Sequence, residues 1–126
     1  RVFYTLPDFG DGVKAALHHD GDVVDPDQVD RRTSAAQDAE ATDLLGRLMP
    51  HAKARLRESQ VCLYTNTPDL HFIIDVHPAH PRQVVVVSAC SGHGFKFATA
   101  VGEIASELLD TGTSHHDLSM FRLARF

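Results

Sequence analysis

The sequence predicts an α+β fold, with a mixed, largely antiparallel sheet of about five strands and two helices. Short runs rich in β-branched and aromatic residues recur between turn signals, as in strands. Apolar residues recur at helical spacing in only two stretches. The strands are expected at residues 2–6, 13–17, 60–65, 71–76 and 84–87, and the helices at 35–49 and 95–111.

Composition bounds the class of protein. The chain has 126 residues, enough for one domain, and 43% of them are apolar, enough for a core. It contains no apolar run long enough to span a membrane, and its net charge of −5 without a basic stripe argues against nucleic-acid binding. The two cysteines, Cys62 and Cys90, are expected in apolar strands and suit a reducing compartment, so we expect a cytoplasmic protein.

The first two strands are expected to pair as a hairpin, because only a short loop with two glycines separates them. Lys14 falls inside the second strand among apolar neighbours. The Lys14 side chain has two possible interpretations. Its aliphatic part lies along apolar surface while the ammonium group reaches solvent, or the ammonium group is directed into a cavity.

Each helix has its own local signals. Ser34 and Gln37 form a capping-box pair before the first apolar stripe, and Pro50 ends that helix. The second stripe is expected to start near Phe97 and to end before Gly112, a C-terminal signal.

The acidic and histidine-rich segments predict no metal site. The aspartates of residues 20–30 lack the glycine and terminal glutamate of a calcium loop, and we expect a surface loop there. The nine histidines include the doublets 18–19 and 115–116, but none has a recognised ligand spacing.

The segment from Ser91 to Phe97, which we call the glycine loop, joins the valine strand to the second helix. Glycines permit a sharp turn and a close approach of a ligand to the backbone, and free N–H groups at a helix start favour an anion. Lys96 lies in the same turn, where a lysine opposes the helix dipole. Either an anion is bound there, or the loop is only a tight strand-to-helix turn.

Three separated motifs resemble the C-terminal part of the monomeric sarcosine oxidase and N-methyltryptophan oxidase family of flavoenzymes. They are CLYTNTPD at 62–69, HFIID at 71–75 and SGHGFKF at 91–97. Further similarity lies at Tyr4, Pro7, Gly12 and Lys14, and at the C-terminal FRLARF. The resemblance covers nearly the whole chain and implies a fragment of a two-domain flavoprotein oxidase fold.

The resemblance implies FAD as the cofactor, carried covalently through Cys62 in the parent enzyme, and it leaves open whether this fragment holds FAD or lacks it. The residues that it places at the flavin are Cys62, Thr65, Gly92, His93, Gly94, Phe95 and Lys96. Donors and a cation there suit the negative charge that a reduced flavin ring holds.

The substrate implied is a small N-methyl amino acid, oxidised with O₂ as the electron acceptor. By resemblance Tyr4, His18 and Tyr64 line the pocket, Lys96 contacts the substrate carboxylate, and Lys14 activates O₂. Lys14 and Lys96 are therefore the candidate catalytic residues. Ala89 and Cys90 depart from the family pattern beside the glycine loop, which leaves the amine undetermined.

No strand–GxGxxG–helix fingerprint occurs in the sequence. We therefore expect residues 1–90 to belong to a substrate domain and 91–126 to contact the flavin and return to an absent N-terminal FAD-binding half. As this fragment alone, the chain is expected to be inactive. The alternative is a non-catalytic remnant that acts as a binding or oligomerisation module, for example a homodimer formed through an exposed apolar face.

Overall fold

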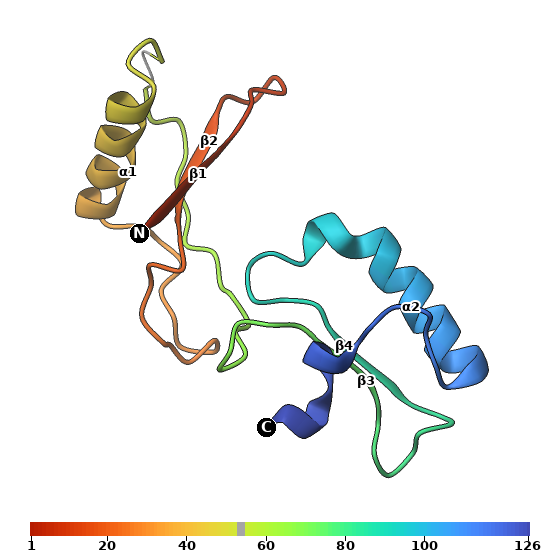
Figure 1. Ribbon diagram of the computed structural model, residues 1–126. Helices are drawn as coiled ribbons and strands as arrows, with labels where there is room; N and C mark the ends of the chain where they lie inside the picture. The colour runs from red at the N-terminus through yellow and green to blue at the C-terminus, as the bar shows by residue number, and fades with distance from the viewer. Residues whose placement is uncertain (53–54) are drawn as a thin grey trace. The chain divides into compact units, whose positions relative to one another are not determined.

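The computed structural model describes residues 1–52 and 55–126, which divide into two compact units, Arg1–Leu63 and Tyr64–Phe126 (Figure 1). The first unit contains β1 (Val2–Leu6), β2 (Lys14–His18) and α1 (Ala35–Leu48). The second contains β3 (Ile73–Val76), β4 (Val85–Ser88), the 3₁₀ turn η1 (Phe95–Phe97), α2 (Ala98–Thr111) and the 3₁₀ turns η2 (Ser119–Phe121) and η3 (Leu123–Arg125). The expected division into a substrate domain at 1–90 and a flavin-contacting part at 91–126 stays a prediction, because it is defined by contacts with ligands.

The predicted hairpin is present as β1 and β2, which pair antiparallel with Leu6 opposite Lys14. The Asp8 carboxylate organises its loop by accepting the N–H groups of Gly10 and Gly12, at 2.7 and 2.9 Å. Both glycines have positive φ, which explains the two glycines in the loop. These backbone donors also hold the pKa of Asp8 below its ordinary value.

Helix α1 begins and ends close to where the sequence predicts. The Ser34 side chain accepts the N–H of Gln37, and the Gln37 side chain accepts the N–H of Ser34, so the predicted capping box is complete. Leu45 is the buried residue of this helix, and α1 contacts β2.

The second unit has its own hydrophobic core. Strands β3 and β4 pair antiparallel with Ile74 opposite Val87, and α2 packs against both strands. Gly112, at φ 78°, closes α2 in the left-handed conformation, as the sequence predicts. The buried residues of this core are Phe72, Ile74, Ile104, Leu108 and Leu118.

The α+β class is confirmed, but the single five-stranded sheet is wrong. The described residues form two antiparallel sheets of two strands each. Residues 60–65 form no strand, although Cys62 and Tyr64 were expected on one strand face. A strand requires a ladder to a neighbour. This segment instead spans the division between the units and makes only isolated bonds, among them Val61 N–H to the Arg31 carbonyl.

The valine run is also less buried than predicted. Val84 and Val87 are 40% and 42% exposed, because a two-stranded sheet is covered by α2 on one face only.

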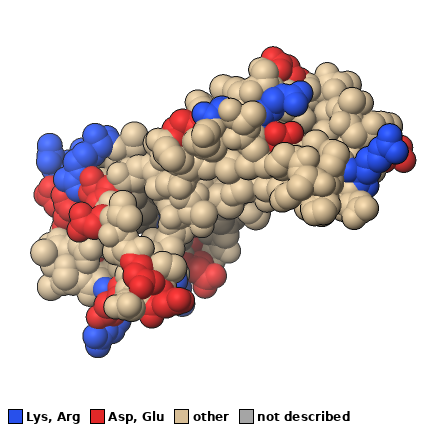
Figure 2. Space-filling model, turned by 90° about the horizontal axis from the view of Figure 1, so that it is seen from below, with Lys and Arg blue, Asp and Glu red and all other residues tan. Residues whose placement is uncertain are grey.

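On the face seen in Figure 2, Lys and Arg side chains lie beside Asp and Glu rather than in a continuous basic stripe. Arg1, for example, contacts both Asp20 and Glu40. No helix among the described residues is both long enough and apolar enough to cross a membrane.

Candidate functional site

The glycine loop begins with two residues in the left-handed region. Ser91 has φ 50° and Gly92 has φ 74°, and the N–H of Ser91 donates to the Thr65 carbonyl at 2.9 Å. A Cβ atom on Gly92 would lie 2.4 Å from the Tyr64 ring. Gly92 is therefore required both by its backbone conformation and by the ring packed against it.

Gly94 is required for a different reason. Its φ of −77° is open to any residue, but a Cβ there would lie 1.6 Å from the carbonyl oxygen of Ala89. The second glycine thus permits the loop to fold back on its own strand, and close approach of a ligand is not needed to explain it.

The α-helix begins later than residue 95, where the sequence predicted its start. The 3₁₀ turn η1 comes first, and α2 begins at Ala98. Within the described residues, the N–H groups of Gly94, Phe95 and Lys96 have no hydrogen-bond acceptor. Phe95 is almost fully exposed, at 96%. The turn therefore presents donors and an aromatic side chain to its surroundings.

Lys96 is exposed in the same turn, and its Nζ lies 5.2 Å from the centre of the Phe97 ring. In the part of the chain that the structure describes, neither Lys96 nor Lys14 is within salt-bridge distance of a carboxylate. Both ammonium groups are thus available to an anion from outside the chain.

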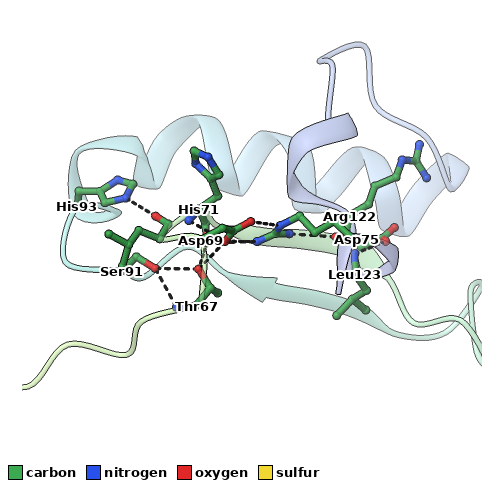
Figure 3. Close-up of polar contacts among 10 residues, drawn as sticks. Thr67, Asp69, His71, Asp75, Ser91, His93, Arg122 and Leu123 are labelled. Atoms are coloured by element: carbon green, nitrogen blue, oxygen red, sulfur yellow. Dashed lines mark hydrogen bonds and ion pairs between the residues drawn. The ribbon is translucent and has the colours of Figure 1, made fainter. Parts of the chain in front are cut away.

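A network of polar contacts holds the start of the glycine loop against the turn before β3. Ser91 is 1% exposed, and its hydroxyl accepts the N–H of Thr67 at 3.3 Å (Figure 3). The Thr67 hydroxyl lies 2.7 Å from the His71 carbonyl oxygen and 3.0 Å from Asp69 Oδ1, and it can donate its one proton to either acceptor. Ser91 is therefore tied to the turn before β3 by both backbone and side chain.

The C-terminal tail completes the network through an ion pair. Arg125 donates through Nε to Asp69 Oδ2 at 2.6 Å and through Nη2 to Oδ1 at 3.2 Å. This bidentate contact, aided by the His71 N–H and the Thr67 hydroxyl, holds the pKa of Asp69 well below its usual range. The Arg122 side chain extends away from this network (Figure 3).

His93 has structural contacts of its own. Its ring stacks on Phe72 with centroids 4.7 Å apart, and its Nε2 lies 2.9 Å from the Leu70 carbonyl. Since a carbonyl only accepts, Nε2 carries the proton. The side chain thus fixes the loop to the core.

The hairpin brings three predicted site residues together in the first unit. The register places Tyr4, Lys14 and His18 on one face, because Leu6 pairs with Lys14 and Val2 with His18. The Lys14 Nζ lies 5.6 Å from the Tyr4 ring centre, and the Tyr4 and His18 rings meet edge to face at 6.1 Å. This face combines a cation with aromatic surfaces.

Cys62 is an exposed free thiol in the irregular segment of the first unit. The expectation that it lies in a strand is wrong, but its exposure leaves the sulfur accessible. Cys90, also predicted in a strand, is exposed and free, two residues after the end of β4. Thr65 is exposed, and its carbonyl is the acceptor for Ser91.

Two surface hollows of the second unit, about 410 and 250 Å³, are lined by α2, the segment after it and nearby residues of β3 and the turn before β4. Neither includes the glycine loop. Within the loop, Ser91 is buried, His93 and Gly94 are half-buried, and Gly92 and the residues of η1 are exposed.

Sequence reasoning missed the Asp69–Arg125 pair and the buried Ser91 hydroxyl. The pair joins residues 56 positions apart, and no spacing rule connects them. The sequence offered one signal for a buried hydroxyl at Ser91, namely a small polar residue directly before the first glycine of the loop.

The profile of the FAD dependent oxidoreductase family matches residues 1–108. The chain therefore belongs to this family of flavin-dependent oxidoreductases.

Among individual curated proteins, the chain is similar to oxidases of sarcosine and of N-methyl-L-tryptophan. The chain is 42% identical over 127 residues to monomeric sarcosine oxidase of Bacillus sp. (strain NS-129), with 98% of this chain and 33% of that protein covered. It is 38% identical over 126 residues to N-methyl-L-tryptophan oxidase of Salmonella enteritidis PT4, with coverage of 98% and 33%. It is 39% identical over 118 residues to peroxisomal sarcosine oxidase of Mus musculus, with coverage of 91% and 30%. The chain thus spans about a third of the length of the relatives it matches.

Proposed function

We propose that this chain is part of an FAD-dependent oxidase that acts on small N-methyl amino acids. The observation that carries the proposal is the 42% identity to a monomeric sarcosine oxidase across 98% of the chain. In the proposed reaction a secondary N-methyl amine, O₂ and water give the free amine, formaldehyde and hydrogen peroxide.

Each unit by itself carries groups whose chemistry suits a flavin. In the first unit, the exposed thiol at Cys62 is accessible for a thioether bond. In the second unit, the turn at Gly94–Lys96 offers N–H donors beside an ammonium group that pairs with no carboxylate of the described residues. FAD supplies the electron acceptor for amine oxidation and the path of electrons to O₂. The pyrophosphate-binding fingerprint is not in the sequence, so we propose that a separate FAD-binding half provides it.

Lys96 has two proposed roles, both electrostatic. Its ammonium group attracts the carboxylate of an amino-acid substrate, and together with the neighbouring N–H groups it stabilises negative charge at the flavin ring edge. Support for both roles comes from its exposure and from the lack of a carboxylate partner among the described residues.

Tyr4 and His18 are proposed to contact the substrate from the hairpin face, and Tyr64 from beside Gly92. Aromatic faces hold a methylated cationic amine by cation–π attraction. Lys14 on the same hairpin face is proposed to favour the first electron transfer to O₂, because a fixed positive charge stabilises the anion that forms.

An oxidase assay tests this function on the gene product that carries these residues. Peroxide formation is followed with sarcosine, other N-methyl amino acids and glycine as the control without a methyl group. We expect turnover of at least one N-methyl amino acid and none of glycine. Lys96→Met should raise KM for the amino acid at least tenfold, whereas Arg122→Met, a change of an exposed cation, should leave KM unchanged.

Absence of turnover and of flavin would instead favour the remnant interpretation. The exposed side chains of Phe95, Phe97 and Val87 would then act as a contact surface, and the chain should form a homodimer in analytical ultracentrifugation.

A further inference from the structure

Three metal-ligating side chains meet beside α2, although their sequence spacing matches no known site. One ligand atom each from Glu103, His115 and His116 lies within 4.8 Å of the others. Gly112 ends α2 in the left-handed conformation and turns the chain back, which brings the histidine doublet toward Glu103, more than two turns before the helix end. All three side chains are exposed and accessible to an ion.

A fourth residue organises the cluster. Glu107 lies one helical turn after Glu103, and its Oε2 accepts the Ser114 hydroxyl at 2.5 Å and the His115 N–H at 3.4 Å. The Ser114 hydroxyl in turn accepts the N–H of His116 at 3.2 Å. One carboxylate therefore holds the segment that carries both histidines, so the cluster does not depend on chance placement of a free loop.

Glu107 also sets the state of the His115 ring. Its Oε1 contacts His115 Nδ1, and because a carboxylate at neutral pH only accepts, Nδ1 carries the proton when the ring is neutral. That leaves the lone pair on Nε2. A carboxylate behind one ring nitrogen and a metal at the other is the usual arrangement around metal-bound histidines.

We propose that Glu103, His115 and His116 form a binding site for a divalent transition metal of the zinc class, with Glu107 as a positioning residue. Two imidazoles and one carboxylate, with water in the remaining position, form a common zinc ligand set. Imidazole ligands favour Zn²⁺, Cu²⁺ and Ni²⁺ over Mg²⁺ and Ca²⁺. The site is independent of the proposed amine oxidation.

Isothermal titration of the purified chain with ZnCl₂, and with MgCl₂ for comparison, tests the proposal. We expect that one Zn²⁺ binds per chain and that binding of Mg²⁺ is not detectable. Glu103→Gln and His116→Ala should each weaken Zn²⁺ binding at least tenfold. Glu107→Gln, which keeps the size of the side chain but not its charge, should weaken it about 10–100-fold. Far-UV circular dichroism checks that these surface variants keep their fold.

Two matched controls separate this site from other zinc-binding groups. His80→Ala alters a different histidine pair, in which the His77 and His80 rings stack with centroids 5.4 Å apart, and Cys62→Ser removes an exposed thiol. Neither should change the affinity of the site. Zn²⁺ affinity that is insensitive to Glu103→Gln and His116→Ala, or lost equally in the control variants, would overturn the proposal, as would absence of Zn²⁺ binding.

Discussion

At Gly94 the carbonyl group of Ala89 occupies the space that a side chain would need, so the backbone of the chain itself requires a glycine here. At Gly92 the Tyr64 ring and a positive φ have the same effect. The SGHG motif therefore specifies a folded loop before any ligand is considered. Lys96 lies in η1, directly after the SGHG residues of this loop.

Gly94→Ala should lower the free energy of unfolding by about 1–3 kcal/mol, the usual cost of forcing extra atoms into a filled space. Gly102→Ala is the matched control, because a Cβ there meets nothing within 4 Å in α2. It should raise stability by about 0.5–1 kcal/mol, since alanine is the better helix former. Urea unfolding measures both changes. Equal effects of the two substitutions would contradict the account of the loop.

The other residue-scale prediction concerns Lys14, whose ammonium group lies over the Tyr4 ring. In the flavin-containing protein, Lys14→Met should slow reoxidation by O₂ tenfold or more and change the reductive step much less. A factor of ten corresponds to about 1.4 kcal/mol of lost charge stabilisation. Lys14→Arg keeps the charge and should retain most of the rate. Stopped-flow traces that show equal losses in both half-reactions would exclude this role.

At the scale of elements, the C-terminal tail secures the second unit. Arg125 in η3 clamps Asp69 before β3, and the Asp75 carboxylate in β3 accepts the N–H of Leu123 at 2.9 Å. Through Thr67 the Asp69 clamp reaches the buried Ser91 hydroxyl at the start of the glycine loop. The tail is therefore connected to the start of the loop by side chains that each lie within hydrogen-bonding distance of the next.

This clamp predicts a dependence of stability on pH. The pKa of Asp69 is lowered in the folded state, so its contribution is complete above the ordinary carboxyl value of about 3.9. It is lost as the pH falls from there through the lowered folded-state pKa. Asp69→Asn should therefore be destabilised at pH 7 and show a shallower loss of stability below pH 4. Asp110→Asn, at the exposed end of α2, should keep the steeper loss of stability below pH 4 that we expect for the unaltered chain.

The elements also show what the sequence could and could not predict. Helix α1 was predicted well because the capping box of Ser34 and Gln37 and the following stripe are local features. The strand at 60–65 was wrong, since strand formation depends on a partner that composition does not reveal. The ion pair between Asp69 and Arg125 could not be predicted from the sequence either, because its two residues are distant along the chain.

For the whole molecule, the chain has two units, and the candidate site residues are distributed between them. Tyr4, Lys14, His18 and Cys62 belong to the first, and Tyr64, Thr65 and the glycine loop to the second. The resemblance of three short motifs identified the family, which the profile match confirms. The role of each residue stays a prediction, because this chain spans about a third of its curated relatives.

The most direct test of the account is the state of Cys62 in the purified gene product. Absorption is recorded before and after acid precipitation, and the tryptic peptide that contains Cys62 is weighed by mass spectrometry. We predict that flavin absorption remains with the precipitated protein, that the peptide carries the added mass of FAD, and that Cys62→Ser abolishes both while Cys90→Ser retains them. A colourless protein with an unmodified Cys62 peptide, or flavin released entirely into the supernatant, would contradict the account.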